Sequence, residues 1–334
     1  MFSYFIKTIL YNYVKFRKRS NFKTTDNSMP LFLGETKLSE YIIMYSFNTL
    51  ITLKEWRNIK DVLEMHMNVK IIEIKQDYRN NRIINLIVRN IPLPQLIDWQ
   101  DEFISKDDVL NIGMGYYGIV GMDLEMFPHA FIAGKAGCGK SNILKCMIHQ
   151  AIKKKYDIVL IDFKRGVSFS RFDNIIPVCY EYKDAMQILG NLVAETMSRL
   201  DLLRKNKVES IKEYNIFYNG YFPRKIVFID ELAELLKTND KDMSKLIYDA
   251  ITTLTRLSRA VGIHLIMGIH RPDSTIISGQ IKNNVPFRVC GKVVDKEPST
   301  IMLDSLKAKN LPDIRGRFIV KDDKYNEVQC FYYL

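Results

Sequence analysis

The sequence predicts an α/β fold in which a mainly parallel sheet, covered by helices, follows a smaller α+β domain. From residue 111 onward, short apolar runs rich in β-branched residues alternate with longer helical stretches, which is typical of βαβ units. Before residue 110, shorter expected strands accompany a single helix. The chain has 334 residues, 47% of them hydrophobic, so it is long enough for one large core and a second, smaller domain.

The first 30 residues are expected to form a basic arm and a linker. The first twenty positions contain no acidic residue but include five basic ones: Lys7, Lys15, Arg17, Lys18 and Arg19. The apolar stretch before this cluster is interrupted by Lys7 and is shorter than the roughly 20 residues that a membrane-spanning helix needs. Three interpretations stay open: the arm lies on an anionic membrane surface, packs on its own protein, or clamps DNA.

Residues 31–110 predict a small α+β domain. Its expected elements are a strand, a helix and two further strands, in chain order: 41–46, 53–67, 70–75 and 83–88. A turn-rich segment at 77–82 separates the last two strands. Pro92 and Pro94 mark the end of the module, because proline fits neither a helix interior nor a central strand.

Residues 111–334 predict the larger α/β domain. Four apolar runs do not alternate with polar residues, so we expect them to be strands buried on both faces: 130–133, 158–161, 226–229 and 265–269. Helices cover both faces of such a sheet, which requires the longer stretches between the runs to be helical. This domain is expected to carry the chemistry.

A glycine-rich segment after the first of these strands carries the most specific motif in the chain. Residues 134–141, GKAGCGKS, match the phosphate-loop pattern, whose glycines let main-chain N–H groups turn toward bound phosphate. We expect Lys140 to contact the β and γ phosphates of ATP, and Ser141 to bind Mg²⁺. The predicted nucleotide-binding residues are Gly134, Lys135, Ala136, Gly137, Cys138, Gly139, Lys140, Ser141 and Asn142.

Two carboxylates follow the apolar run at 226–229. Asp230 is at the tip of the expected strand, where it could bind the Mg²⁺ ion. Glu231 comes one residue later and could polarise the attacking water, which makes it a candidate catalytic residue. Adjacent acids at a strand end are also common in solvated loops, but the phosphate loop earlier in the chain favours the functional interpretation.

The apolar run at 265–269 ends in His270 and Arg271. The carboxyl ends of parallel strands lie at one edge of a sheet, so these side chains could reach the γ-phosphate from a neighbouring strand. We therefore predict that His270 and Arg271 are catalytic residues that sense the phosphate. The alternative for His270 is an ordinary core or surface histidine.

Together these segments resemble the FtsK/SpoIIIE family of DNA translocases. The resemblance covers roughly residues 112–318 and rests on the phosphate loop and on the following stretches: 112–113, 126–129, 161–164, 229–235, 257–264, 271–272 and 279–286. The sequence departs from the family pattern at two of these places. Phe163 replaces the usual proline, and His270 stands where a glutamine is usual, which leaves the hydrogen bonding of the sensor open.

The resemblance implies a RecA-like P-loop NTPase motor domain that hydrolyses ATP with Mg²⁺. It also implies a homo-hexamer that holds double-stranded DNA in its channel, mainly through phosphate contacts. We expect this protein to do without the winged-helix module and the multi-span membrane region of the cell-division members. We therefore expect a compact coupling or transfer ATPase of a plasmid or conjugative element, with a relaxase or membrane channel as partner. The rival interpretations are a protein-secretion ATPase of the same superfamily and an ATP-gated binding subunit that does not hydrolyse ATP.

The composition agrees with an anionic partner in a reducing compartment. The formal net charge of +11 favours nucleic acid or an anionic membrane surface as the partner. The five cysteines are odd in number and form no CxxC pair. We therefore expect a cytoplasmic protein, with a peripheral contact at the inner face of the cell membrane if the arm binds lipid.

Two arginines precede the expected sensor strand. Arg256 and Arg259 are three residues apart, so helical spacing places them on one helix face. In a ring motor the active site lies at a subunit boundary and takes a cation from the neighbour. We predict that Arg256 or Arg259 supplies this catalytic cation in trans, with Arg288 in reserve. The alternative is a pair of cations on a solvated surface.

Overall fold

The computed structural model describes residues 30–219 and 221–333, which form two compact units. Their described parts are 30–93 with 116–118, and 94–115 with 119–219 and 221–333. The basic arm that we expected at 1–30 lies outside the described residues, except for Pro30. Residues 94–110, which we assigned to the N-terminal domain, belong to the second unit. Within the two described ranges, no helix combines the length and the hydrophobicity that a membrane crossing requires.

The smaller unit is an antiparallel sheet with two short helices. Its strands pair in the order β1-β2-β4-β3. Its elements are β1 (Leu31–Lys37), β2 (Ile42–Asn48), α2 (Leu53–Asn58), α3 (Lys60–Met67), β3 (Lys70–Gln76) and β4 (Ile83–Arg89). The helices bury Trp56 and Leu63 against Phe47 and Leu86 of the sheet, which gives this unit a hydrophobic core of its own.

The prediction of a single helix at 53–67 is wrong, because two helices, α2 and α3, occupy this stretch. Ile59 has φ −99° and ψ 7°, outside the α-helical region, and lies between α2 and α3. Trp56, Ile59 and Leu63 all face the same core, so the periodic pattern continues across the break and does not reveal it. The three expected strands are confirmed to within two residues, whereas β1 was not expected.

The larger unit is built on a ten-stranded mixed sheet, in the order β6-β5-β14-β13-β12-β7-β11-β10-β8-β9. Its strands are β5 (Val109–Gly115), β6 (Gly118–Asp123), β7 (Ala130–Ala133), β8 (Asp157–Ile161), β9 (Val178–Cys179), β10 (Lys225–Ile229), β11 (Ile263–Ile269), β12 (Phe287–Gly291), β13 (Arg317–Lys321) and β14 (Tyr325–Cys330). Strands β12 to β9 pair in parallel, whereas β13 and β14 extend the sheet antiparallel. The four expected strands are confirmed as β7, β8, β10 and β11, and with them the predicted fold class. The antiparallel part was not expected.

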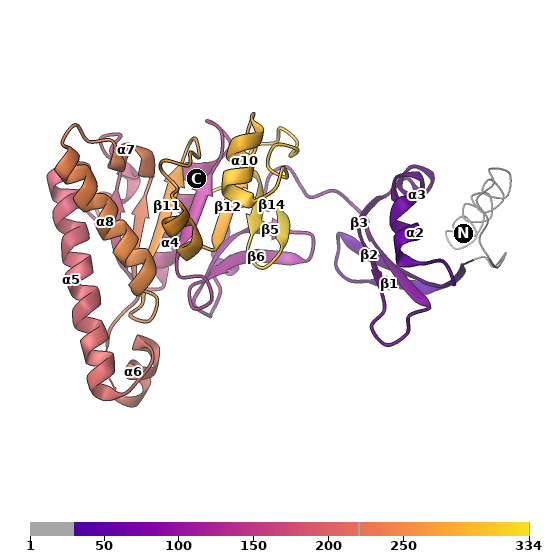
Figure 1. Ribbon diagram of the computed structural model, residues 1–334, viewed down its shortest axis with the longest axis horizontal. Coiled ribbons are helices and arrows are strands. Elements are labelled where there is room, and N and C mark those ends of the chain that lie inside the picture. The colour runs from indigo at the N-terminus through magenta and orange to yellow at the C-terminus, as the bar shows by residue number, and fades with distance from the viewer. Residues whose placement is uncertain (1–29, 220, 334) are drawn as a thin grey trace. The chain divides into compact units, whose positions relative to one another are not determined.

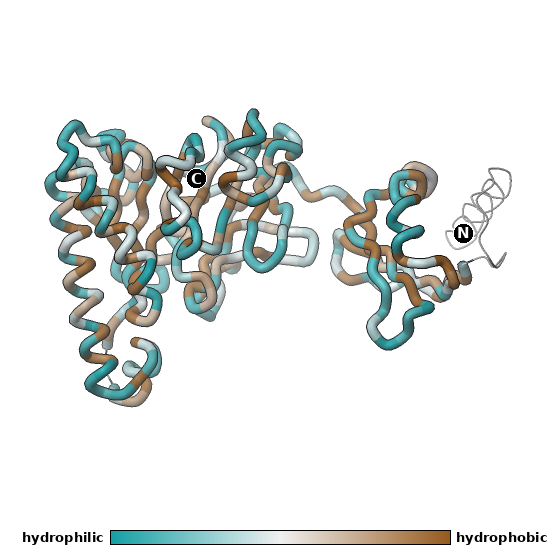
Figure 2. Tube along the Cα trace, viewed as in Figure 1, coloured by the Kyte–Doolittle hydropathy of each residue, from teal (hydrophilic) through white to brown (hydrophobic). Residues whose placement is uncertain are grey.

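Helices cover both faces of this sheet (Figure 1). On one face, α4 (Lys140–Lys153) packs its apolar side against the strands. The helices that contribute to the core on the other face are α5 (Tyr182–Asn206), α6 (Ile211–Phe217), α7 (Leu232–Leu236), α8 (Lys241–Leu257), α9 (Gly279–Asn284) and α10 (Lys296–Leu303). Figure 2 shows hydrophobic residues along the central strands and mixed colouring along α5, as expected of a helix with one buried face.

The strand order brings the polar strand ends together. Strands β7, β11, β10 and β8 are neighbours, and their register pairs Ile229 of β10 with both Ile161 of β8 and Met267 of β11. The carboxyl ends of these parallel strands therefore lie at one edge of the sheet, which is where α/β proteins bind ligands. The segments that follow the four strands carry the phosphate loop and the candidate catalytic residues.

Candidate nucleotide-binding site

The phosphate loop connects β7 to the first turn of α4. Gly139 is the N-cap of α4 and has φ 113°, a left-handed conformation that residues with a Cβ rarely adopt. Within the described residues, the main-chain N–H groups of Gly137, Gly139 and Ser141 donate to no main-chain carbonyl. Free N–H groups at the start of a helix form an anion-binding site, so the loop has the geometry that a phosphate needs.

Lys140 lies beneath this loop and faces two carboxylates. Its side chain is 3% exposed, and its Nζ donates to the main-chain oxygen of Asp230. The same Nζ lies 3.5 Å from a carboxylate oxygen of Asp230 and 3.5 Å from one of Glu231. The structure therefore brings together the phosphate-loop lysine and both predicted acids, although they are far apart in the sequence.

Asp230 is fully buried and, besides the 3.5 Å bond from Lys140, accepts hydrogen bonds from three further side chains. The donors are Ser141 Oγ at 3.2 Å, Lys164 Nζ at 2.7 Å and Ser168 Oγ at 3.1 Å. Burial raises the pKa of Asp230, but the charge of Lys140 and the bond from Lys164 outweigh it, so the pKa lies below its ordinary value. Asp230 therefore stays ionised. Its carboxylate and the Ser141 hydroxyl are the oxygen ligands that Mg²⁺ prefers.

Lys164 and Ser168 were missed as site residues. Both are positioned by Asp162, whose carboxylate accepts from the main-chain N–H groups of Lys164 at 3.0 Å and Ser168 at 2.7 Å. The segment at 161–164 could have indicated Lys164, because it contributed to the family resemblance, but no role was predicted for this lysine. The spacing of Ser168 carries no such signal, because its contact with Asp230 depends on the turn that Asp162 stabilises.

Glu231 is held by His270 at the end of the neighbouring strand. The His270 main-chain N–H donates to one carboxylate oxygen at 3.1 Å, and the ring Nδ1 contacts the other. Burial raises the pKa of Glu231, but the hydrogen bond with His270 and the charge of Lys140 together lower it by more, so the pKa lies below its ordinary value. His270 therefore lies at the predicted site, where it positions the candidate catalytic base.

The cavity above the phosphate loop has a volume of about 370 Å³ and is rich in cations. Lys140 and His270 line it, as do four basic residues from different parts of the chain: Lys135, Lys145, Arg171 and Arg315. Arg171 lies over the ring of Tyr333, 5.1 Å from its centroid. Arg171 and Arg315 were not predicted, since neither belongs to a motif. Arg271 does not line this cavity but a larger one beside Glu231.

The candidate arginines for action in trans differ in their surroundings. Helix α8 ends at Leu257, so the expectation that Arg256 and Arg259 share one helix face is wrong: Arg259 lies in the turn before β11. Both are exposed and near the amino end of β11, whereas the phosphate loop is at the carboxyl edge. Arg288 is 7% exposed and donates to Val285, Lys282 and Asp304 of its own chain, which indicates a structural role.

The fold and this site define the chain as a P-loop ATPase. The FtsK/SpoIIIE family model matches residues 102–227. The DNA translocase FtsK of Leptospira interrogans is 33% identical over 287 residues, which cover 79% of this chain and 30% of that protein. The structure of the pCW3 conjugation coupling protein TcpA, monomer form with ATPγS, is 34% identical, covers 97% of this chain and 95% of its own, and has a TM-score of 0.72. The chain belongs to the FtsK/SpoIIIE family.

The relatives differ in how much of their length the chain represents. It spans about 30% of the curated FtsK protein with which it shares the 33% identity. A structure of EssC from Geobacillus thermodenitrificans, with ATPases 2 and 3, is 17% identical, covers 72% of this chain and has a TM-score of 0.63. At that identity the likeness supports the fold alone.

Proposed function

We propose that this chain is an ATP-hydrolysing motor that moves double-stranded DNA during plasmid or conjugative-element transfer. The observation that carries the proposal is its similarity, along 97% of its length, to a conjugation coupling protein solved with ATPγS. The curated FtsK relatives, named as DNA translocases, support DNA as the substrate. Assembly as a homo-hexamer in the cytoplasm, at the inner face of the membrane beside a relaxase or channel, is part of the same proposal.

The residues of the site fit Mg²⁺-ATP. Free N–H groups of the loop and the Lys140 ammonium would bind the phosphates, and Ser141 and Asp230 would hold Mg²⁺. The ion would neutralise charge on the phosphate oxygens. Glu231, kept ionised, would orient and polarise the attacking water, while His270 fixes the direction of its carboxylate. This division of roles uses residues that follow three neighbouring strands, β7, β10 and β11.

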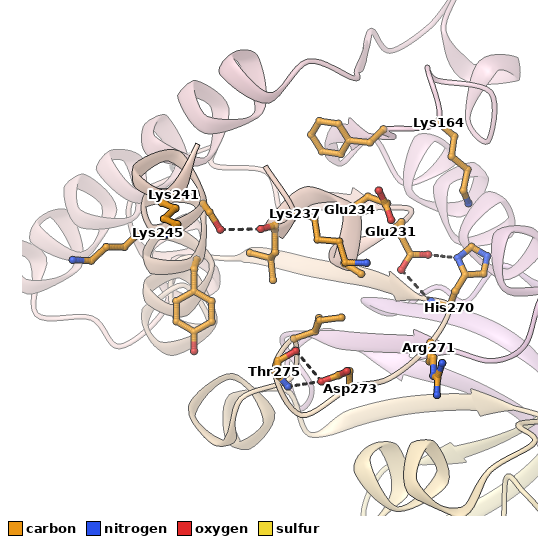
Figure 3. Close-up of a pocket in the computed structure, with 16 residues that line it drawn as sticks. Lys164, Glu231, Glu234, Lys237, Lys241, Lys245, His270, Arg271, Asp273 and Thr275 are labelled. Carbon is orange, nitrogen blue, oxygen red and sulfur yellow. Dashed lines mark hydrogen bonds and ion pairs between the residues drawn. The ribbon is translucent and has the colours of Figure 1, made fainter. Parts of the chain in front are cut away.

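A second cavity, next to Glu231 and His270, has the charge that a polyanionic substrate would require. It has a volume of about 750 Å³ and includes Glu231 and His270 among its lining residues (Figure 3). Five cations also line it: Lys164, Lys237, Lys241, Lys245 and Arg271. Such a cluster would attract DNA phosphates and would place them beside the groups that hydrolyse ATP. DNA bound there would contact Arg271, whose neighbour His270 holds the Glu231 carboxylate, so DNA binding would influence the position of Glu231.

The test is ATPase activity with and without duplex DNA. We expect DNA to raise the rate, and we expect K241E/K245E to reduce the ratio of stimulated to unstimulated rate by about tenfold, because each added acid repels the phosphates. The matched control is K183E/K205E, which makes the same charge change on exposed lysines of α5 outside the cavity. Equal stimulation in both double variants would contradict the assignment of the cavity.

The rival functions predict other outcomes of this experiment. A protein-secretion ATPase would hydrolyse ATP at a rate that DNA does not change. An ATP-gated binding subunit would bind ATP without turnover under either condition. Either result would overturn the proposed motor function, whereas strong stimulation by duplex DNA is expected only of the motor.

A further inference from the structure

Helix α6 and the loop after it expose large apolar side chains at one end of the larger unit. Four residues of this stretch are between 49% and 79% exposed: Ile216, Phe217, Tyr218 and Tyr221. We call these four residues the α6 tip. Figure 1 shows α6 beside the C-terminal end of α5. Single exposed apolar residues are ordinary on a protein surface, whereas a group of them within one turn and the following loop indicates an interaction surface.

Hydrogen bonds hold the α6 tip in one conformation. The Asn215 side chain donates to Phe222 O at 3.0 Å and accepts from Phe222 N at 3.1 Å, which closes the loop. The Tyr218 hydroxyl donates to Asn206 O, in the last turn of α5, at 3.1 Å. The ring of Tyr214 stacks on that of Tyr218, with centroids 5.1 Å apart. The exposed side chains are therefore presented on a preformed surface, which lowers the entropy cost of binding a partner.

Basic residues lie beside the α6 tip. The end of α5 supplies three exposed cations: Arg204, Lys205 and Lys207. The bond from Tyr218 to Asn206 places them next to the tip. Within the described ranges, none of these three side chains takes part in an ion pair. The stretch 204–221 contains four cations and two acids, so it carries a net positive charge.

A cavity of about 340 Å³ opens beside the tip and is also basic. Ile216 and Tyr221 line it, as do four cations: Lys154, Lys155, Lys212 and Arg224. Asp108 is the only acid among the described lining residues, and it pairs with Arg224 at 2.7 Å. Lys155 is exposed and has no ion pair in the described part of the chain. An anionic group in this cavity would therefore meet cations inside and apolar side chains at the rim.

These features require a partner that is both anionic and apolar. Duplex DNA is anionic, but its bases are stacked inside the helix and its surface is phosphate and sugar, so the α6 tip would gain little from it. A second copy of this chain would bring its own net charge of +11, which opposes docking on a basic patch. A bilayer with anionic headgroups has both properties. Its phosphates attract lysine and arginine, and its interface accommodates aromatic and aliphatic side chains.

We propose that the α6 tip and the cations beside it dock this protein on an anionic phospholipid membrane. Helix α6 has 7 residues, far fewer than the roughly 20 that cross a bilayer, so the contact is peripheral. The tip lies toward the amino edge of the sheet, where Ile211 N donates to Ala260 O at 2.8 Å, whereas the nucleotide site is at the carboxyl edge. Membrane binding there does not depend on ATP hydrolysis or DNA, so it and the proposed motor function can fail separately.

Vesicle sedimentation with the full chain tests the docking surface. Vesicles of phosphatidylcholine mixed equally with phosphatidylglycerol should bind the wild type, and vesicles of phosphatidylcholine alone should bind it at least about tenfold more weakly. I216S/F217S should weaken binding to the mixed vesicles by about tenfold, because two large apolar side chains are lost. The matched control is L246S/V294S, since Leu246 and Val294 are also largely exposed but lie outside α6 and its loop. Equal binding by I216S/F217S and wild type would overturn the proposal.

A fluorescence signal at the tip separates this surface from the basic arm at 1–19. Tyr221→Trp adds an exposed tryptophan, whereas the native Trp56 is buried and Trp99 is half-buried. On the mixed vesicles, the added emission should shift to shorter wavelength and be quenched by brominated lipid, relative to wild type. Binding of Tyr221→Trp to the vesicles without either change would show that another part of the chain touches the lipid, which contradicts the proposal.

The other possible occupants of the surface give different results. I216S/F217S should keep the wild-type ratio of DNA-stimulated to unstimulated ATPase rate and the wild-type sedimentation velocity. Loss of DNA stimulation with unchanged vesicle binding would assign the tip to DNA, and loss of self-association with unchanged vesicle binding would assign it to a second copy. Either result would overturn membrane docking. A wild type that DNA does not stimulate would instead overturn the motor function and leave the vesicle results valid.

Discussion

Lys140 and Glu231 are close in space but are expected to act at different stages. Lys140 is buried beneath the phosphate loop, between the carboxylates of Asp230 and Glu231. Its positive charge is one reason why the pKa values of both acids lie below their ordinary values. Lys140 would thus bind phosphate directly, whereas Glu231 is needed for the attacking water.

This division predicts different defects in two variants. Lys140→Ala removes the main phosphate cation and also leaves two buried carboxylates without it, so nucleotide binding should be lost. Glu231→Gln keeps an acceptor for the His270 N–H but removes the base, so binding should persist while kcat falls by about 10²–10⁴-fold. Equilibrium binding and single-turnover hydrolysis measure the two effects. An equal loss of binding in both variants would contradict the roles.

Strand β11 places a glycine where two strands and the lysine meet. A Cβ on Gly268 would lie 2.2 Å from the main-chain oxygen of Asp230 and 2.9 Å from Lys140 Nζ. The first of these contacts is with backbone, which does not move aside easily. The close approach of β11 to β10 therefore depends on the absence of a side chain at position 268 and sets the position of the Lys140 ammonium.

We expect Gly268→Ala to displace Lys140 or the end of β10. The ATP analogue should bind at least tenfold more weakly, and the free energy of unfolding should fall by about 1–3 kcal/mol. Gly190→Ala is the control, because Gly190 lies in α5, where an added Cβ would meet no neighbouring atom within 4 Å. That change should stabilise the helix by about 0.5–1 kcal/mol and leave binding unchanged. Wild-type affinity in Gly268→Ala would show that the contact relaxes without effect.

The position of the exposed Arg256 and Arg259 matters for how copies of the chain would assemble. Arg256 and Arg259 lie near the amino end of β11, whereas the phosphate loop follows the carboxyl end of β7, its parallel neighbour. They therefore lie toward the opposite edge of the sheet from their own nucleotide site. Any catalytic role for them requires the site of another copy, and Arg288 is an unsuitable substitute because it is buried and bonded within its chain.

We predict that Arg256→Ala or Arg259→Ala binds ATP but hydrolyses it about 10³-fold more slowly. Mixing the affected variant with Lys140→Ala should restore part of the activity, because one protein keeps the intact pocket and the other donates the arginine. ATPase rates across a series of mixing ratios measure this rescue. The absence of recovery for both arginines at every ratio would show that neither crosses a subunit boundary.

The sequence alone determined the parts of the site that are encoded locally. The phosphate loop, Asp230 and Glu231 were identified because each lies in a short, contiguous pattern of strand, turn and acid. The four parallel strands were found for the same reason, since an apolar run signals burial on both faces. The break at Ile59 was hidden, because the pattern of buried residues continues through it.

How distant residues complete the site depends on the folding of the whole chain. Lys164 and Ser168 reach Asp230 across more than sixty positions, and His270 reaches Glu231 from another strand. The segment at 97–99 is held by main-chain pairing with Tyr332, a contact that side-chain identity does not encode. Such contacts are set by strand order and loop closure, which arise from the packing of the whole chain and leave no periodic trace in the sequence.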